Sequence, residues 1–159
     1  MLSRFLPRQA DNSFAGHRAA LWLLGLFIAL KIVMGVNSIL NTESVAVGAD
    51  GIPLDSYGPA AARQVLTLFA LTSLGQLTLA LVGLTVLVRY RSLVAFMFAV
   101  FLAEQIARRL IVQSHAVGST EGGSPGLYIN LGLMALLALG LLLSLLPARQ
   151  PSPQAVKEN

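Results

Sequence analysis

The chain has 159 residues, the length of one ordinary domain, but its composition excludes most soluble folds. Hydrophobic residues make up 55% of it, charged residues only 11%, and the mean hydropathy is +0.73. A soluble domain usually carries about 25% charged residues to cover its surface. The composition therefore predicts an integral membrane protein.

The charge and the cysteine content exclude further classes. The net charge is +4, but the basic residues stand in small groups beside the ends of apolar segments. No basic run is interleaved with aromatic residues, as single-stranded nucleic acid binding requires, so we expect no nucleic acid partner. The sequence has no cysteine, which excludes a disulfide framework, a thiolate nucleophile and a cysteine-ligated metal or haem.

Four apolar segments follow a polar head, residues 1–18. Each has about 20 residues or more, enough to cross a hydrocarbon core of about 30 Å as a helix. The expected spans, within a transmembrane domain 19–146, are about 19–40, 60–88, 92–112 and 127–146. The third span is the weakest because the apolar run before Glu104 is short. If this segment is only a half-inserted hairpin, the even number of spans is wrong.

The distribution of Lys and Arg predicts the orientation of the spans. One face holds the basic residues of the head, of the link between spans two and three, and of the tail: Arg4, Arg8, Arg18, Arg89, Arg91, Arg149 and Lys157. The other face has only Arg63, at the start of the second span. We therefore expect an all-α bundle of four transmembrane helices with both termini in the cytoplasm. The Pro-rich tail 147–159 is expected to be disordered.

The first apolar segment is expected to stay in the mature chain as a membrane anchor. It is longer than the 7–15 residues of a signal-peptide core, and no clear cleavage site follows it. The excess of Arg, Ala and Leu over Lys is typical of bacteria with GC-rich genomes. We therefore expect a multi-pass protein of the bacterial inner membrane.

Three spans carry a strongly polar residue at one depth: Lys31, Gln76 and Glu104. Each lies 13 residues from a basic residue of the cytoplasmic face, or roughly 20 Å into the membrane. One interpretation is a buried Lys31–Glu104 pair completed by Gln76, acting as a structural clamp that fixes helix order. A second is a functional site on a proton or solute path. In a third, no pair forms and Lys31 extends to the headgroups.

The outer half of span three is polar over a wide arc, with Arg108 and Arg109 after Glu104. Such a helix is expected to border an outward-opening, positively charged cavity. Two adjacent arginines suit an anionic lipid headgroup or a small anion. The alternative is that Arg108 pairs with Glu104, its favourable i, i+4 partner, while Arg109 reaches the interface.

The sequence predicts no catalytic residue, metal site or cofactor. His17 and His115 are expected at opposite membrane surfaces, too far apart to share a metal or haem. No zinc-protease, nucleophile-elbow or phosphate-loop motif is present in the sequence.

The leading hypothesis for function is a small non-enzymatic membrane protein, an accessory or binding subunit. It would associate through its helices with itself or a larger complex. The alternative is a transporter or channel with a midplane site at Lys31, Gln76 and Glu104, and an anion-attracting cavity at Arg108 and Arg109. A membrane enzyme acting on a lipid comes third, because no nucleophile–base pair is visible.

Overall fold

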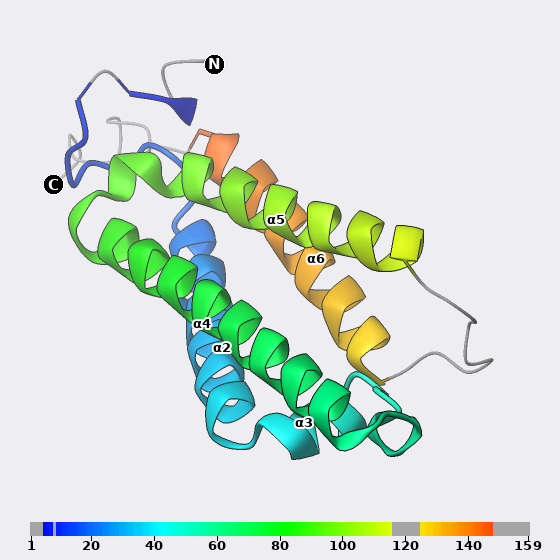
Figure 1. Cartoon of the computed structure of the whole chain (residues 1–159). Helices are drawn as coiled ribbons and strands as arrows, with labels where there is room; N and C mark the ends of the chain where they lie inside the picture. The colour runs from blue at the N-terminus through cyan, green and yellow to red at the C-terminus, as the bar shows by residue number, and fades with distance from the viewer. Residues whose placement is uncertain (1–4, 8, 116–124, 148–159) are drawn as a thin grey trace, which may run out of the picture.

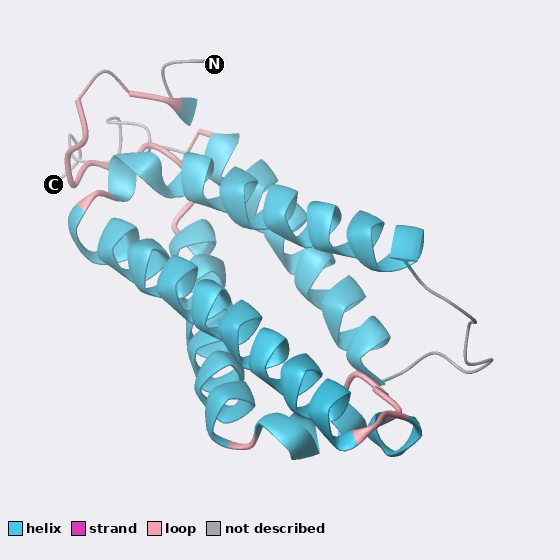
Figure 2. Cartoon of the chain, in the orientation of Figure 1, coloured by secondary structure: helices cyan, strands magenta, loops and turns pink. Residues whose placement is uncertain are grey.

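The structure is a computed structural model that describes residues 5–7, 9–115 and 125–147. Its long elements are all helices, as the hydropathy predicted (Figure 2). They are α2 (Ala19–Leu40), α3 (Thr42–Gly48), α4 (Pro59–Arg89), α5 (Val94–His115) and α6 (Pro125–Leu145). Two short 3-10 turns, Leu54–Ser56 and Arg91–Leu93, precede α4 and α5. Each of the four apolar segments therefore corresponds to one long helix.

Helix α2 lies at the centre of the bundle. It packs along α4 on one side and along α6 on another, while α5 packs mainly on α6 (Figure 1). The core where these helices meet is apolar and rich in phenylalanine, with Phe27, Phe98, Phe101, Leu24, Ile28 and Leu137 almost fully buried. Helices α4 and α5 follow each other in the chain but make only limited contact.

Two glycines allow the phenylalanine rings of α5 to approach the neighbouring helices. The ring of Phe98 lies against Gly140 of α6, where a Cβ atom would overlap it. The ring of Phe101 lies against Gly83 of α4, and a Cβ there would come within 2.8 Å of it. Small residues at these positions let membrane helices pack closely where apolar burial gives little drive.

Within the described residues, three helices are long and apolar enough to cross a membrane: α2, α4 and the part of α6 from Tyr128 to Leu145. Their mean hydropathies are 2.3, 1.9 and 2.1. Helix α5 has 22 residues, but Glu104, Arg108 and Arg109 lower its apolar character. The protein thus has the helices of a multi-pass membrane protein. Whether α5 also crosses the membrane, and which way the helices are oriented, stay predictions.

The described part of the N-terminal head folds onto the bundle. The Asp11 amide donates to Ser92 Oγ, and Ser92 Oγ donates to the Asp11 carbonyl, both at 3.0 Å. The His17 amide donates to the carbonyl of Leu143 at the end of α6 (3.0 Å), and Phe5 meets Phe96 edge to face. The head, the α4–α5 link and the end of α6 therefore meet at one end of the bundle (Figure 1).

The long connection between α2 and α4 contains structure that hydropathy did not predict. Helix α3 begins directly after α2, and Ala46 on it is fully buried. The chain then turns at Gly51, whose φ of 68° lies in the left-handed region that favours glycine. The link between α5 and α6 and the tail 148–159 lie outside the described residues.

Candidate functional site

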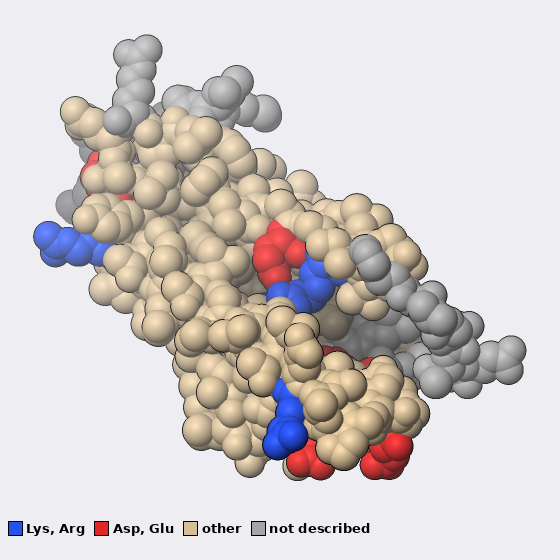
Figure 3. Space-filling view, viewed as in Figure 1, with Lys and Arg blue, Asp and Glu red and all other residues tan. Residues whose placement is uncertain are grey.

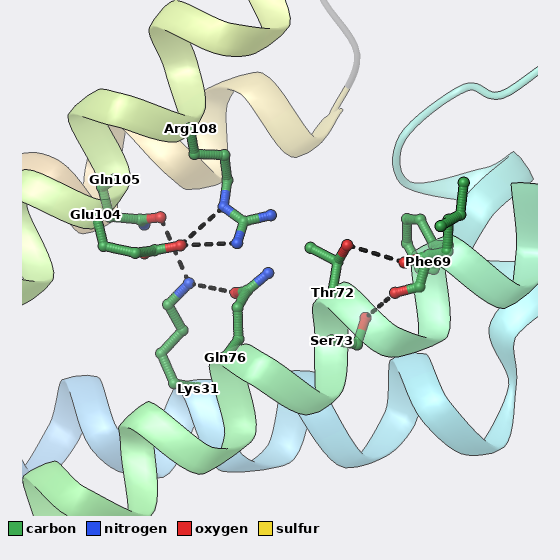
Figure 4. Close-up of polar contacts among 9 residues, drawn as sticks. Lys31, Phe69, Thr72, Ser73, Gln76, Glu104, Gln105 and Arg108 are labelled. Atoms are coloured by element: carbon green, nitrogen blue, oxygen red, sulfur yellow. Dashed lines mark hydrogen bonds and ion pairs between the residues drawn. The ribbon is translucent and has the colours of Figure 1, made fainter.

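Lys31 lies at the centre of a hydrogen-bond network between three helices. Its side chain on α2 is only 4% exposed. The ammonium Nζ donates to Gln76 Oε1 of α4 at 2.7 Å and to Gln105 Oε1 of α5 at 3.5 Å (Figure 4). The ring of Phe27, one turn earlier on α2, lies 5.8 Å from the ammonium. We call Lys31, Gln76 and Gln105 the Lys31 network.

Glu104 pairs with its neighbour on the same helix rather than with Lys31. Arg108 Nη2 and Nε donate to Glu104 Oε1 at 2.7 and 3.0 Å. No ion pair joins Lys31 to Glu104 within the described ranges. The predicted Lys31–Glu104 pair is therefore replaced by the i, i+4 alternative, because a glutamate four residues before an arginine on a helix is already within its reach. The charges of Lys31 and Glu104 still lie close enough to attract each other.

Gln105 is the member of the network that the depth argument missed. It lies at the same depth as Glu104, but one residue further on the helix turns its side chain by about 100°. This rotation directs Gln105 toward Lys31, and its side chain is 4% exposed. The signal was present in the sequence as a second polar residue beside Glu104, on a span whose inner half is uniformly apolar.

The arginines of α5 lie at the edge of this buried region. The side chain of Arg108 is 31% exposed and that of Glu104 24%. Arg109 is partly exposed and makes no hydrogen bond or ion pair with another described residue. In the space-filling view an acidic and a basic group lie side by side in a hollow between α4 and α5 (Figure 3). The guanidinium of Arg108, paired with Glu104, thus lies next to the Lys31 network (Figure 4).

One further charge reaches this region from the connection after α3. Asp50 lies close enough to Arg108 for their charges to attract. Partial burial raises the pKa of Asp50 above its ordinary value of 3.8, and the attraction by Arg108 opposes that rise. Lys31, Arg108 and Arg109 together outnumber Glu104 and Asp50, so the region keeps a positive excess.

Two other hollows contain no residue of the Lys31 network. One, of about 440 Å³, lies between the end of α2 and α3 and is lined by Met34, Asn37, Ser38, Asn41, Ser44, Val45 and Ala49. The other, of about 140 Å³, lies under the head beside Asp11, Ser92 and Ser144. No group of three or more His, Cys, Asp or Glu side chains suited to a metal ion occurs in the part of the chain that the structure describes. His17 instead accepts a hydrogen bond from the Ala19 amide at the start of α2.

Comparison of the chain with protein-family models, with curated proteins and with solved structures gives no match. The function has to be inferred from the arrangement of the residues themselves.

Proposed function

We propose that this chain is a small, non-enzymatic multi-pass protein of the bacterial inner membrane, an accessory or binding subunit that associates through its helices. The observation that carries the proposal is the Lys31 network. The Lys31 ammonium and the side-chain oxygens of Gln76 and Gln105 are used in contacts between α2, α4 and α5. A buried charge held by neutral amides of two other helices fixes which helices are neighbours and at what height.

The fourth crossing is supported by the outer surface of α5. Glu104 and Arg108 pair on one side of the helix, whereas Ile106 and Leu110, on the opposite side, are exposed and apolar. An apolar outer face suits contact with lipid, and charged groups in a membrane helix are expected on the protein side. The head and the end of α6 meet at one end of the bundle, as an even number of crossings requires. These features support a four-helix bundle with both termini on one side of the membrane, and the Lys and Arg bias of the sequence favours the cytoplasmic side.

Thiol labelling in whole cells tests this topology. Single cysteines are introduced at Ser13, Ser56 and Ser152 and treated with an impermeant maleimide. Ser56→Cys, in the exposed turn before α4, should react in intact cells. Ser13→Cys and Ser152→Cys should react only after the membrane is opened. Labelling of Ser152→Cys in intact cells would show an odd number of crossings and leave α5 outside the membrane core.

Association through the helices is supported by the lipid-facing surface of α2. Although this helix is central, it keeps one exposed apolar face, formed by Trp22, Leu26, Val33 and Leu40. Oxidative cross-linking of Val33→Cys in native membranes tests for a second copy, with Leu84→Cys, an exposed position on α4, as the matched control. A dimer with Val33→Cys alone supports self-association through α2. A monomer with both, together with a native complex of monomer size, would contradict the accessory role.

An anion carrier is the second candidate, favoured by the positive excess around Arg108 and Arg109. A positively charged hollow beside apolar helices attracts anions strongly, because the local dielectric constant is low. Reconstituted vesicles decide between the candidates. An accessory subunit gives no chloride or phosphate flux above that of empty vesicles, whereas a carrier gives flux that Arg109→Gln reduces.

A further inference from the structure

Gln105 has a buried donor without an acceptor. Its Nε2 is the one buried side-chain nitrogen or oxygen that lacks a hydrogen-bond partner among the described residues. Turning the amide over does not solve this, because Nε2 would then face the Lys31 ammonium, which is itself a donor. A buried donor left without an acceptor destabilises the fold. The hydrogen bonds of the Lys31 network are therefore incomplete.

The Glu104–Arg108 pair is also incomplete. Arg108 directs two nitrogens to the single oxygen Oε1, whereas a fully matched arginine–carboxylate pair uses both oxygens. Glu104 Oε2 makes no hydrogen bond with another described residue, and Lys31 already attracts this carboxylate. Glu104 thus has a second cation close by, on α2.

We propose that Glu104 exchanges Arg108 for Lys31 when an oxyanion binds to Arg108. The ligand class is a phosphate or carboxylate group, because a guanidinium fork binds both with two parallel hydrogen bonds. The exposed part of Arg108 receives the oxyanion, and the displaced Glu104 carboxylate takes over the ammonium from Gln105 Oε1. Gln105 is then free to turn its amide to another acceptor. This inference rests on the proposed binding role, since it names the ligand of the same layer.

The charges around Lys31, Glu104 and Arg108 favour an anion as the ligand. Among the described residues, Lys31, Arg108 and the adjacent Arg109 are opposed by Glu104 and by Asp50, which leaves a positive excess. An anion at Arg108 neutralises this excess, and the exchange leaves each carboxylate or oxyanion with its own cation. Helix α5 packs mainly on α6, so a small shift of α5 against α2 and α4 leaves its principal contacts in place.

Thermal unfolding of the purified full-length protein tests the exchange. The midpoint is measured in dodecyl maltoside against increasing sodium phosphate, with sodium chloride at equal ionic strength as reference. We expect phosphate to raise the midpoint. Glu104→Gln should tighten the apparent affinity about tenfold, because it removes the group that competes for Arg108. Arg63→Gln, an exposed arginine at the start of α4, is the matched control and should leave the affinity unchanged.

A double substitution separates exchange from direct contact. Lys31→Met should weaken phosphate binding when Glu104 is present, because the displaced carboxylate loses its second cation. In the Glu104→Gln background the same substitution should have no effect on the affinity. Equal weakening in both backgrounds would show that Lys31 contacts the anion directly, and would overturn the exchange. If Arg108→Gln does not fold, the Glu104→Gln/Arg108→Gln variant removes both charges and should lose the phosphate response.

Nanodiscs distinguish the two sources of the oxyanion. A midpoint raised in phosphatidylglycerol over phosphatidylcholine, and lost in the Glu104→Gln/Arg108→Gln variant, supports a lipid headgroup. A response to free phosphate alone supports a solute. If neither source shifts the midpoint of the parent protein, the site does not exist. That outcome leaves the Lys31–Gln76 hydrogen bond untouched, so it fails this inference without failing the proposed function.

Discussion

Adding one methyl group at Gly140 tests how closely α5 and α6 pack. A Cβ at Gly140 would overlap the ring of Phe98, whereas a Cβ at Gly132, two turns earlier on the same helix, meets nothing within 4 Å. Both Gly→Ala substitutions gain about 0.5–1 kcal/mol from helix propensity. This gain cancels when the variants are compared. The difference isolates the steric cost, about 1–3 kcal/mol for an overpacked core.

The assay is thermal unfolding in dodecyl maltoside, followed by the circular dichroism of the helices. Gly132→Ala should match or exceed the parent protein, and Gly140→Ala should unfold several degrees lower. In the Gly140→Ala background, Phe98→Leu should recover part of the loss, because it removes the ring that the methyl group meets. Equal midpoints for the two alanine variants would refute the packing of α5 on α6 described above.

The remaining predictions concern the two ends of the bundle: Asp50 in the connection after α3, and the docked N-terminal head. Because the pKa of Asp50 is raised above 3.8 in the folded protein, the free energy of unfolding falls as the pH rises from 3.8 to that raised value. Asp50→Asn should therefore stabilise the protein near pH 7, by less than about 0.5 kcal/mol, since only part of the side chain is buried and the rest is exposed to solvent. The gain should vanish below pH 3.8, and midpoints recorded from pH 3 to 8 check this. Ser92→Ala removes two hydrogen bonds to Asp11, so hydrogen exchange should quicken in residues 9–17 while the helices keep their protection. Unchanged exchange in the head would contradict its docking on the α4–α5 link.

Hydropathy was sufficient to locate the long helices, because each apolar segment must satisfy its backbone hydrogen bonds internally in lipid. It did not predict α3, since a helix of 7 residues with exposed polar positions has little periodicity to detect. The sequence pattern did not predict the docking of the head either. It depends on contacts such as that between Asp11 and Ser92, which lie 81 residues apart in the sequence.

The depth argument correctly brought Lys31 and Gln76 together, because residues at equal distance from the same membrane surface meet when their helices are neighbours. It named Glu104 as the third member and missed Gln105. These two lie at one depth, and only the rotation of α5 about its axis decides which of them faces Lys31. That rotation is set by the packing of Phe98 and Phe101 against glycines on α6 and α4, which no local pattern reveals.

The central claim is that the Lys31 network joins the helices, and a pair of double-mutant cycles tests it most directly. Free energies of unfolding are measured in chloride buffer without phosphate for Lys31→Met, Gln76→Leu and their combination, and likewise for Lys31→Met with Glu104→Gln. The hydrogen bond of 2.7 Å between Lys31 and Gln76 predicts a coupling of about 1.5–3 kcal/mol, the range for bonds to charged groups. The coupling between Lys31 and Glu104 should be smaller, since Glu104 pairs with Arg108. Additive losses in the first cycle, or a larger coupling in the second, would contradict the account.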